Sequence, residues 1–304
     1  MEDLIIIGAG PAGLTAGLYA ARSRLRVVLL ERLAPGGQIV TTDWVENYPG
    51  FPEGISGFEL VDRMKRQTEK FGLVIENQQV ARVELTPEKK IVVTDKGTLE
   101  SQAVILACGA TPQRLSIDGE EQMTGKGVSY CATCDGPFYK DKEVAVIGGG
   151  DTALEEAIFL TRFASKVYLI HRRNKLRAIK LLQDRAAEEE KIKFILDTIP
   201  TRIAGETGVE GLDLKNIKTG EMKHLSVEGV FVFVGYSPNS ELVKGLVALD
   251  EDGFVITNGN METSVPGVFA AGDIRSKLLR QVSTAVGEGA TAAFAAEKYL
   301  ESLK

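Results

Sequence analysis

Two glycine-rich segments of similar design occur in the chain, and they constrain its fold more than any other feature. The first, Gly-Ala-Gly-Pro-Ala-Gly at residues 8–13, follows an apolar run at residues 4–7, and the second, Gly-Gly-Gly-Asp-Thr-Ala at residues 148–153, follows an apolar run at residues 144–147. A helix-like pattern of small and apolar residues comes after each segment. Strand, glycine-rich turn and helix in this order are typical of a Rossmann unit, in which the turn lets the backbone approach a pyrophosphate.

The first unit has an acid at the end of its second strand. This strand is expected at residues 27–30, and it ends in Glu31, which lies 23 positions after Gly8 (31 − 8 = 23). A carboxylate at this distance is typical of a site where it binds both hydroxyls of a ribose. We therefore interpret the unit as a dinucleotide site for a ligand with a free ribose, such as FAD, rather than as an ordinary turn. The residues of the turn that we expect at this site are Gly8, Gly10, Pro11, Ala12 and Gly13.

The second unit repeats the spacing but replaces the acid with basic residues. From Gly148 to His171 there are again 23 positions (171 − 148 = 23). Guanidinium groups can fork onto a ribose 2′-phosphate, which a carboxylate would repel, so the second site should prefer NADPH over NADH. A solvated basic face is the alternative interpretation of these arginines. The residues that we expect at this site are Gly148, Gly150, Asp151, Thr152, His171, Arg172, Arg173 and Arg177.

The order of the segments predicts that one domain is inserted into the other. Each glycine-rich unit is followed by strand-like segments and a closing apolar run, at residues 103–106 in the first and 230–233 in the second. The first domain then lacks its last strand and helix, and suitable segments occur near the end of the chain, at residues 267–273 and 281–300. Asp273, at the end of this strand, is placed to bind a ribityl hydroxyl of a flavin, or else to cap a helix.

The expected fold class is α/β, with two Rossmann-like dinucleotide-binding domains. Each domain should have three layers, with a parallel sheet and a β-meander. We expect a discontinuous FAD-binding domain at residues 1–112 and 242–304, and an NADPH-binding domain at residues 113–241 that also carries a pair of cysteines. The two crossings between the domains should act as a hinge.

The cysteine pair is Cys131-Ala-Thr-Cys134, followed directly by Asp135. Three cysteines in 304 residues do not make a disulfide framework. A zinc knuckle needs four ligands, but the chain has one other cysteine, Cys108, and two histidines, of which His171 lies at the second nucleotide site. We interpret the pair as a redox dithiol and expect no metal. A helix start can lower the pKa of one thiol, and Asp135 could relay a proton or cap the helix.

Composition excludes several other classes of function. The formal net charge is −6, and no basic stripe of the kind that nucleic acids require is present. No apolar run is long enough to cross a bilayer, and the first residues lack the pattern of a secretory signal. We therefore expect a cytoplasmic protein that binds neither nucleic acid nor a membrane.

Taken together, these motifs resemble the low-molecular-weight thioredoxin reductases of the bacterial type. The resemblance covers nearly the whole chain and is carried by the cysteine motif at residues 131–135, the second turn at 148–153, the basic segment at 171–177, and residues 269–273 with 280–281. It implies the fold of the FAD/NAD(P)-binding flavoprotein disulfide reductases, a homodimer, FAD and NADPH as cofactors, and thioredoxin as the protein substrate. It also implies further residues at the FAD site, namely Arg32, Gly36, Gly37, Gln38, Asn47, Gly109, Gly272, Asp273, Arg280, Gln281 and Val282.

The resemblance also assigns roles to the redox residues. Cys134 would face the flavin, Cys131 would exchange with the thioredoxin disulfide, and Asp135 would act as the acid. Four other functions remain to be compared with this one. The first is a flavin reductase of another thioredoxin-like partner, and the second is a hydroperoxide reductase flavoprotein, which needs an additional redox domain. The third is a ferredoxin-linked thioredoxin reductase, which has no use for the arginines, and the fourth is a nucleotide sensor, which has no use for the cysteines.

Two residues depart from the pattern of the family. Cys108 stands where Thr is expected, before Gly109, which places a third thiol close to the FAD site. We interpret Cys108 as a small buried residue. Glu31 stands where many relatives have a neutral residue, and we expect it to make the ribose contact more conventional.

Overall fold

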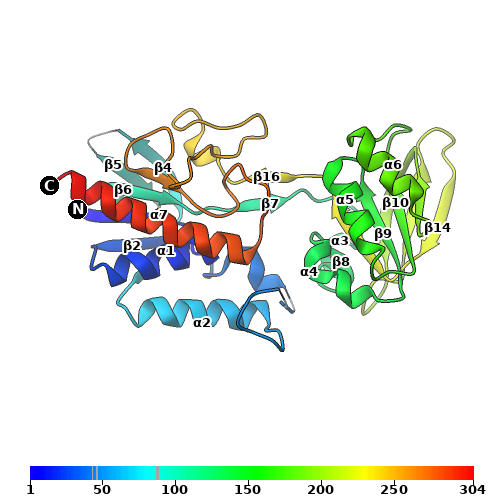
Figure 1. Cartoon of the computed structure of the whole chain (residues 1–304), viewed down its shortest axis with the longest axis horizontal. Coiled ribbons are helices and arrows are strands. Elements are labelled where there is room, and N and C mark those ends of the chain that lie inside the picture. The colour runs from blue at the N-terminus through cyan, green and yellow to red at the C-terminus, as the bar shows by residue number, and fades with distance from the viewer. Residues whose placement is uncertain (43, 46, 87–88) are drawn as a thin grey trace. The chain divides into compact units, whose positions relative to one another are not determined.

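The protein consists of two compact units, and the second is inserted into the chain of the first. The computed structural model describes residues 1–304 except 43, 46 and 87–88 (Figure 1). Unit 1 comprises Met1–Thr111 and Ser237–Lys304, and unit 2 comprises Pro112–Tyr236.

Unit 1 is built on one seven-stranded sheet. Its strand order is β3-β2-β1-β6-β5-β4, and β17 also pairs with β6. The neighbours β3, β2, β1, β6 and β17 are parallel, whereas β4, β5 and β6 form an antiparallel meander. The strands are β1 (Glu2–Ile7), β2 (Val27–Glu31), β3 (Val74–Asn77), β4 (Val80–Leu85), β5 (Lys90–Thr94), β6 (Gly97–Leu106) and β17 (Val268–Ala270).

Strand β6 belongs to both parts of this sheet because it is ten residues long. Its first half pairs with β5, and its second half pairs with β1 over residues 103–106 and with β17 over residues 104–106. The strand from the end of the chain therefore completes a sheet that the first hundred residues begin, as the order of the apolar segments predicted.

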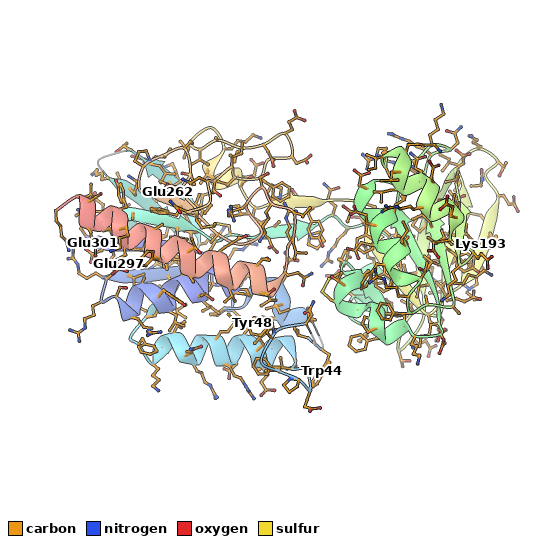
Figure 2. The ribbon with its side chains drawn as sticks, viewed as in Figure 1. Trp44, Tyr48, Lys193, Glu262, Glu297 and Glu301 are labelled. Carbon is orange, nitrogen blue, oxygen red and sulfur yellow. A yellow bond between two sulfur atoms is a disulfide. The ribbon has the colours of Figure 1, made fainter. Side chains whose placement is uncertain are left out.

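Helices cover one face of the unit 1 sheet. The helices are α1 (Pro11–Arg22), α2 (Gly57–Glu69) and α7 (Val282–Ser302), with 3₁₀ turns η1 (Gly37–Thr41) and η3 (Glu241–Val243). Residues Leu4 and Ile6 of β1 pack against the helices, and the alternate residues Ile5 and Ile7 pack on the opposite face. A strand that is buried on both faces reads as a continuous apolar run, which is why residues 4–7 show no alternation. Glu297, toward the C-terminal end of α7, accepts a hydrogen bond from Ser23 at the end of α1 (Figure 2).

Unit 2 repeats this plan with two separate sheets. The parallel sheet has the order β11-β10-β9-β15-β8, and the antiparallel meander has the order β12-β13-β14. The strands are β8 (Val128–Ser129), β9 (Glu143–Gly148), β10 (Lys166–Ile170), β11 (Ile192–Ile195), β12 (Thr198–Ala204), β13 (Gly211–Asn216), β14 (Met222–Ser226) and β15 (Gly229–Phe233). The helices are α3 (Glu120–Met123), α4 (Ala132–Asp135), α5 (Asp151–Leu160) and α6 (Lys180–Glu188), with the 3₁₀ turn η2 (Gly136–Tyr139).

The two faces of the unit 2 sheet explain its three layers. Val144 and Val146 of β9 pack against α5 and α6, and Ala145 and Ile147 pack against the meander. The expected fold class, two Rossmann-like units of three layers with a parallel sheet and a meander, is confirmed. The chain passes between the units twice, through β7 (Ala110–Pro112) and β16 (Tyr236–Pro238), and these two short strands pair with each other. Within the described part of the chain, no helix has both the length and the apolar character that a membrane span requires.

Candidate dinucleotide sites and redox centre

The glycines of the first turn have separate structural tasks. A Cβ atom at Gly8 would lie 2.5 Å from the carbonyl oxygen of Ala107, and φ at Gly8 is +105°. A Cβ atom at Gly13 would lie 1.8 Å from the carbonyl oxygen of Gly8, so helix α1 can pack on β1 only with glycine there. Gly10 differs, because a Cβ atom there would meet nothing within 4 Å and its φ of −72° suits any residue. Gly10 therefore faces open space at the N-terminus of α1, where the phosphates of a dinucleotide would lie.

Glu31 lies beside this turn at the end of β2. Its carboxylate accepts one hydrogen bond from the backbone N–H of Ala9, at 2.9 Å, and another from that of Leu33, at 3.0 Å. The two backbone bonds hold the carboxylate at the edge of the turn, where a ribose would lie next to the phosphates. Arg32, the next residue, is exposed.

A second loop closes on the first turn. The backbone N–H of Gly36 donates to the carbonyl oxygen of Ala9, at 2.8 Å, and a Cβ atom at Gly36 would collide with Val40 and Val61. Gly37 begins η1, and the side-chain amide of Gln38 donates to the carbonyl oxygen of Ala110. Residues 36–38 therefore lie against both the first turn and Ala110, which follows Gly109. At Gly109, a φ of +69° and an open Cβ position leave space beside the backbone.

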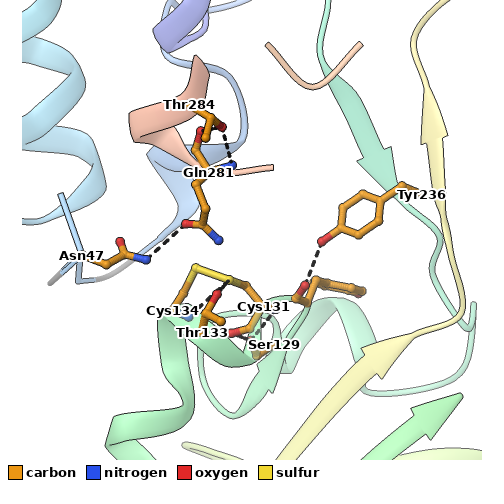
Figure 3. Close-up of a disulfide and its surroundings, with 9 residues drawn as sticks. Asn47, Ser129, Cys131, Thr133, Cys134, Tyr236, Gln281 and Thr284 are labelled. Carbon is orange, nitrogen blue, oxygen red and sulfur yellow. Dashed lines mark hydrogen bonds between the residues drawn. A yellow bond between two sulfur atoms is a disulfide. The ribbon is translucent and has the colours of Figure 1, made fainter. Parts of the chain in front are cut away.

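The end of the chain brings further predicted residues to unit 1. Arg280 donates to the carbonyl oxygen of Asp273 and lies 4.0 Å from the centre of the Phe254 ring. Gln281 caps α7 in a capping box with Thr284, and the side chain of Asn47 donates to the Gln281 side chain at 3.1 Å (Figure 3). Val282, the first residue of α7, packs on the cluster of Val45, Ile55 and Leu60.

Asp273 follows β17 and Gly272 and is not the cap of a helix, because Gln281 takes that position on α7. Its Oδ1 atom is buried and lies 3.1 Å from Nζ of Lys277. Lys277 in turn contacts Glu288 of α7. Glu288 was not predicted from the sequence, although an acid within an Ala-rich helix was a visible signal.

The second turn has the same backbone plan. A Cβ atom at Gly148 would lie 2.5 Å from the carbonyl oxygen of Phe233, whereas one at Gly150 would meet nothing within 4 Å. A Cβ atom at Gly149 would collide with the ring of His171, at 2.3 Å from Nδ1. The His171 ring is therefore packed against the turn, and it is buried with no hydrogen-bond partner for Nε2.

The loop after β10 closes around this turn. The backbone N–H groups of Arg177 and Ala178 donate to the carbonyl oxygen of Gly149, and Ile179 donates to Oδ1 of Asp151. The side chains of Arg172, Arg173 and Arg177 are exposed, as is that of Thr152 on the first turn of α5. Burial, followed by the charges of the three arginines, lowers the pKa of His171, so its ring is neutral at neutral pH.

Both turns fit a dinucleotide. Gly10 and Gly150 leave space where each helix begins, and the first four N–H groups of a helix offer donors to phosphate. The exposed arginines beside the second turn suit the 2′-phosphate of NADPH, and Glu31 beside the first suits the free ribose of FAD.

The two cysteines of the redox centre are joined by a disulfide. Cys131 is the N-cap of α4, and its sulfur accepts a hydrogen bond from the backbone N–H of Cys134 at 3.2 Å (Figure 3). Thr133 Oγ1 lies 3.3 Å from the same sulfur, and the backbone N–H of Asp135 donates to the carbonyl oxygen of Cys131. A helix N-terminus at the sulfur favours a thiolate once the disulfide is reduced.

The segment that leads into Cys131 is held from three sides. Ser129 Oγ accepts a hydrogen bond from the Cys131 N–H, and Tyr236 Oη donates to the carbonyl oxygen of Tyr130 at 2.9 Å. The Tyr130 hydroxyl donates to buried Glu120, whose carboxylate also accepts two backbone N–H groups at residues 115 and 116. Burial and the Glu120 carboxylate raise the pKa of Tyr130 to about 12, so it remains a donor. The sequence offered no signal for Glu120 or Tyr236.

Cys108, the remaining cysteine, is free and partly buried, and its sulfur lies 3.6 Å from the carbonyl oxygen of Ile7. Burial and then the charge of Glu31 raise the pKa of this thiol to about 12. It is therefore a thiol and a poor nucleophile at neutral pH.

Among the described residues, no group of three or more His, Cys, Asp and Glu side chains could hold a metal ion.

Two nucleotide-type turns and a Cys-x-x-Cys disulfide define a class, the two-domain disulfide oxidoreductases that use nucleotide cofactors. The family "Pyridine nucleotide-disulphide oxidoreductase" matches residues 2–289. The chain is 50% identical over 307 residues to a thioredoxin reductase of Peptoclostridium litorale, covering 99% of this chain and 98% of the relative. It is 46% identical to that of Bacillus subtilis (strain 168), covering 99% and 96%.

A solved structure gives the same assignment. The crystal structure of thioredoxin reductase from Streptococcus pyogenes MGAS5005 matches with a TM-score of 0.95 and 48% identity, covering 99% of each chain. The chain belongs to the bacterial-type thioredoxin reductases, as the motifs predicted.

Proposed function

We propose that the protein is an NADPH-dependent thioredoxin-disulfide reductase that works through FAD and the Cys131–Cys134 pair. The observation that carries this conclusion is a disulfide at a helix N-terminus in a chain with two open glycine turns. A carboxylate lies beside the first turn, and arginines lie beside the second. FAD, when bound, relays two electrons from NADPH to the disulfide. The ferredoxin-linked alternative is not favoured, because the exposed arginines beside the second turn would have no role in it.

The assignment of FAD to unit 1 and of NADPH to unit 2 is part of this proposal. For FAD it is supported by the carboxylate of Glu31, held beside the open Gly10, and by the hydrogen bonds of Arg280 to Asp273 and of Asn47 to Gln281. We assign to the FAD site Gly8, Gly10, Pro11, Ala12, Gly13, Glu31, Arg32, Gly36, Gly37, Gln38, Asn47, Gly109, Gly272, Asp273, Arg280, Gln281 and Val282.

For NADPH the support is the exposed basic segment beside the open Gly150. His171 is assigned a positioning role, because its neutral ring packs against Gly149 and shapes the turn. We assign to the NADPH site Gly148, Gly150, Asp151, Thr152, His171, Arg172, Arg173 and Arg177.

The chain's own residues can then perform thiol–disulfide exchange. The Cys131 thiolate attacks one sulfur of the thioredoxin disulfide, forms a mixed disulfide and releases one thioredoxin thiolate. The Cys134 thiolate then attacks the Cys131 sulfur, which re-forms the Cys131–Cys134 bond and releases the second thioredoxin thiolate. Asp135 supplies a proton to a departing thiolate and recovers it when a new thiol is deprotonated.

The protein partner is thioredoxin, which the relatives' names state as their substrate. One of them, from Mycobacterium leprae (strain TN), is named "Bifunctional thioredoxin reductase/thioredoxin" and carries both in one chain. We further propose a homodimer, on the resemblance alone, and a cytoplasmic location, because a chain with a free Cys108 and one exchangeable pair suits a reducing compartment. Light scattering of the purified protein checks the dimer.

The test is the rate of NADPH oxidation by the purified flavin-loaded protein, with thioredoxin present and then absent, and the same pair with NADH. We expect oxidation that requires thioredoxin and favours NADPH. If NADPH bleaches the flavin but thioredoxin does not restore its colour, the partner assignment is wrong. If neither nucleotide bleaches the flavin, the electrons come from another donor, and the assignment of the arginines to an NADPH site is wrong.

A further inference from the structure

Four charged side chains form a network behind the turn at Gly272 and Asp273, within unit 1. The carboxylate of Glu288 on α7 lies 2.9 Å from Arg275 and 3.3 Å from Lys277, and Lys277 lies 3.1 Å from Asp273. The side chains of Arg275, Lys277 and Glu288 are only 11%, 8% and 14% exposed. The formal charges of the two cations and the two carboxylates balance. Glu288 contacts both cations, and Lys277 contacts both carboxylates.

The network also holds the backbone of the turn. The N–H group of Gly272 donates to Oε2 of Glu288 at 2.7 Å, and Gly272 has a φ of +80° that requires glycine. A Cβ atom at Gly272 would lie 2.9 Å from Cβ of Ala12, so the turn is packed on the first residues of α1. Arg280 donates to the carbonyl oxygen of Asp273 from the other side. Glu288 therefore fixes the turn against the helix whose N-terminus forms the first nucleotide turn.

Lys277 leaves one oxygen of Asp273 available. Oδ1 of Asp273 is buried against Lys277, whereas the whole side chain is 32% exposed, so the exposed part lies on the remaining atoms, which include Oδ2. A carboxylate held through one oxygen presents the other in a defined direction, which is what a hydroxyl of a ligand requires.

The packing of α7 gives no reason for these charges. The helix is held by small and apolar residues, among them Ala285, Ala292, Ala296 and Leu300, that pack on the sheet and on α1. Buried ion pairs often contribute no net stability, because desolvation of both partners offsets their attraction. Their use is then to specify one arrangement, which here is that of Gly272 and Asp273.

We propose that Glu288 and Lys277 are positioning residues for the flavin cofactor. Glu288 holds the Gly272 N–H and both cations, and Lys277 holds Oδ1 of Asp273, so that the turn is formed before the cofactor binds. This inference rests on the assignment of FAD to unit 1. Neither residue touches the cofactor in this proposal, and a ligand that meets a formed turn loses less free energy to ordering it.

The test is a double-mutant cycle with Glu288→Gln, Lys277→Met and the double variant, each as the full-length, flavin-loaded protein. FAD release is followed by the recovery of flavin fluorescence on dilution, and the unfolding midpoint of the flavin-free chain is measured separately. We expect each single change to weaken FAD binding by at least about tenfold, which is about 1.4 kcal/mol. The double variant should lose less than the sum, because the two side chains contact each other.

A matched control lies on the same helix. Lys298 and Glu301 form an exposed pair at its C-terminal end, where Figure 2 labels Glu301. Lys298→Met with Glu301→Gln should leave FAD binding within twofold of the wild type. If the singles lower only the unfolding midpoint and leave FAD binding within twofold, the network serves packing and the inference is wrong. If Glu288→Gln does not fold, Lys277→Met alone decides, because it breaks no backbone hydrogen bond. A wild-type protein that binds no FAD would instead overturn the proposed function.

Discussion

The turns at residues 8–13 and 148–153 can be compared residue by residue. In each, a Cβ atom on the first glycine would lie 2.5 Å from a carbonyl oxygen at the end of the neighbouring strand, that of Ala107, directly after β6, in one and that of Phe233, the last residue of β15, in the other. In each, Gly10 or Gly150 faces open space with an ordinary φ, of −72° and −93°. The two turns therefore share the same backbone plan, and the backbone does not distinguish one nucleotide from another.

The difference lies in what stands beside each turn. In unit 1 the carboxylate of Glu31 is held by two backbone N–H groups, whereas in unit 2 the equivalent position holds His171, packed on the turn, with exposed arginines behind it. Unit 2 carries the disulfide, and unit 1 carries the charged network at Asp273. Side chains at strand ends, rather than the shared backbone, thus distinguish the two copies of one fold.

The largest expected effect comes from replacing a cysteine of the disulfide, which lies in unit 2. Cys134→Ser should lower thioredoxin turnover by about 10³-fold or more, because the mixed disulfide can no longer be resolved and the flavin has no disulfide to reduce. Bleaching of the flavin by NADPH should remain. Cys108→Ser is the control, since its buried thiol has a raised pKa, and it should leave turnover unchanged. Substantial turnover in Cys134→Ser would disprove the dithiol mechanism.

The next prediction concerns the open glycines. Gly10→Ala should weaken FAD binding by about 10- to 100-fold, or about 1.4–2.8 kcal/mol, because the methyl group fills space meant for phosphate. Gly150→Ala should raise the KM for NADPH by a similar factor and leave flavin content unchanged. Flavin-free samples of both should unfold at the wild-type midpoint, whereas Gly13→Ala, whose Cβ atom would lie 1.8 Å from a carbonyl oxygen, should be strongly destabilised. Equal effects of Gly10→Ala and Gly150→Ala on both cofactors would refute the division between the units.

Charge at the second strand end should decide between NADPH and NADH. Arg172→Ala with Arg173→Ala should lower kcat/KM for NADPH by about 10- to 100-fold, the worth of one or two charge-assisted hydrogen bonds. The value for NADH should change by less than about threefold. Arg185→Ala, an exposed arginine on α6, is the control. A parallel fall for both nucleotides would mean that the arginines are only a solvated basic face.

The smallest effect is on stability and belongs to unit 2. Burial and then the charge of Glu155 raise the pKa of Glu156 on α5 from 4.5 to about 7, whereas helix α1 of unit 1 contains no acid. Between these two values the folded chain keeps a proton that the unfolded chain has lost, so the free energy of unfolding falls as pH rises from about 4.5 to 7.

Glu156→Gln should remove this dependence and raise the free energy of unfolding at pH 8 by about 1 kcal/mol, after allowance for solvent screening at a partly exposed group. Chemical denaturation at pH 5 and pH 8 measures it. Glu155→Gln should keep most of the dependence, because burial is the larger cause. An unchanged pH dependence in Glu156→Gln would show that the carboxylate is solvated.

Much of the fold was predictable because its signals are local. Strand, turn and helix follow one another within about thirty residues in a Rossmann unit, so the apolar runs and glycines could be recognised in order. The use of β17 to complete the first sheet was also predictable, since the first unit otherwise lacked a last strand. The double membership of β6 was not, because it depends on where a long strand changes partners.

The sequence by itself determined the two nucleotide turns, the opposite charges at their strand ends and the redox pair. Each of these depends on residues that are neighbours along the chain, whose spacing follows from helix and strand geometry. Only the tertiary structure decided that Asn47 meets Gln281, that Tyr236 holds the carbonyl of Tyr130, and that Glu288 holds Gly272. These contacts join residues from 16 to 234 positions apart, and no local pattern encodes them, because they exist only once separate elements have packed together.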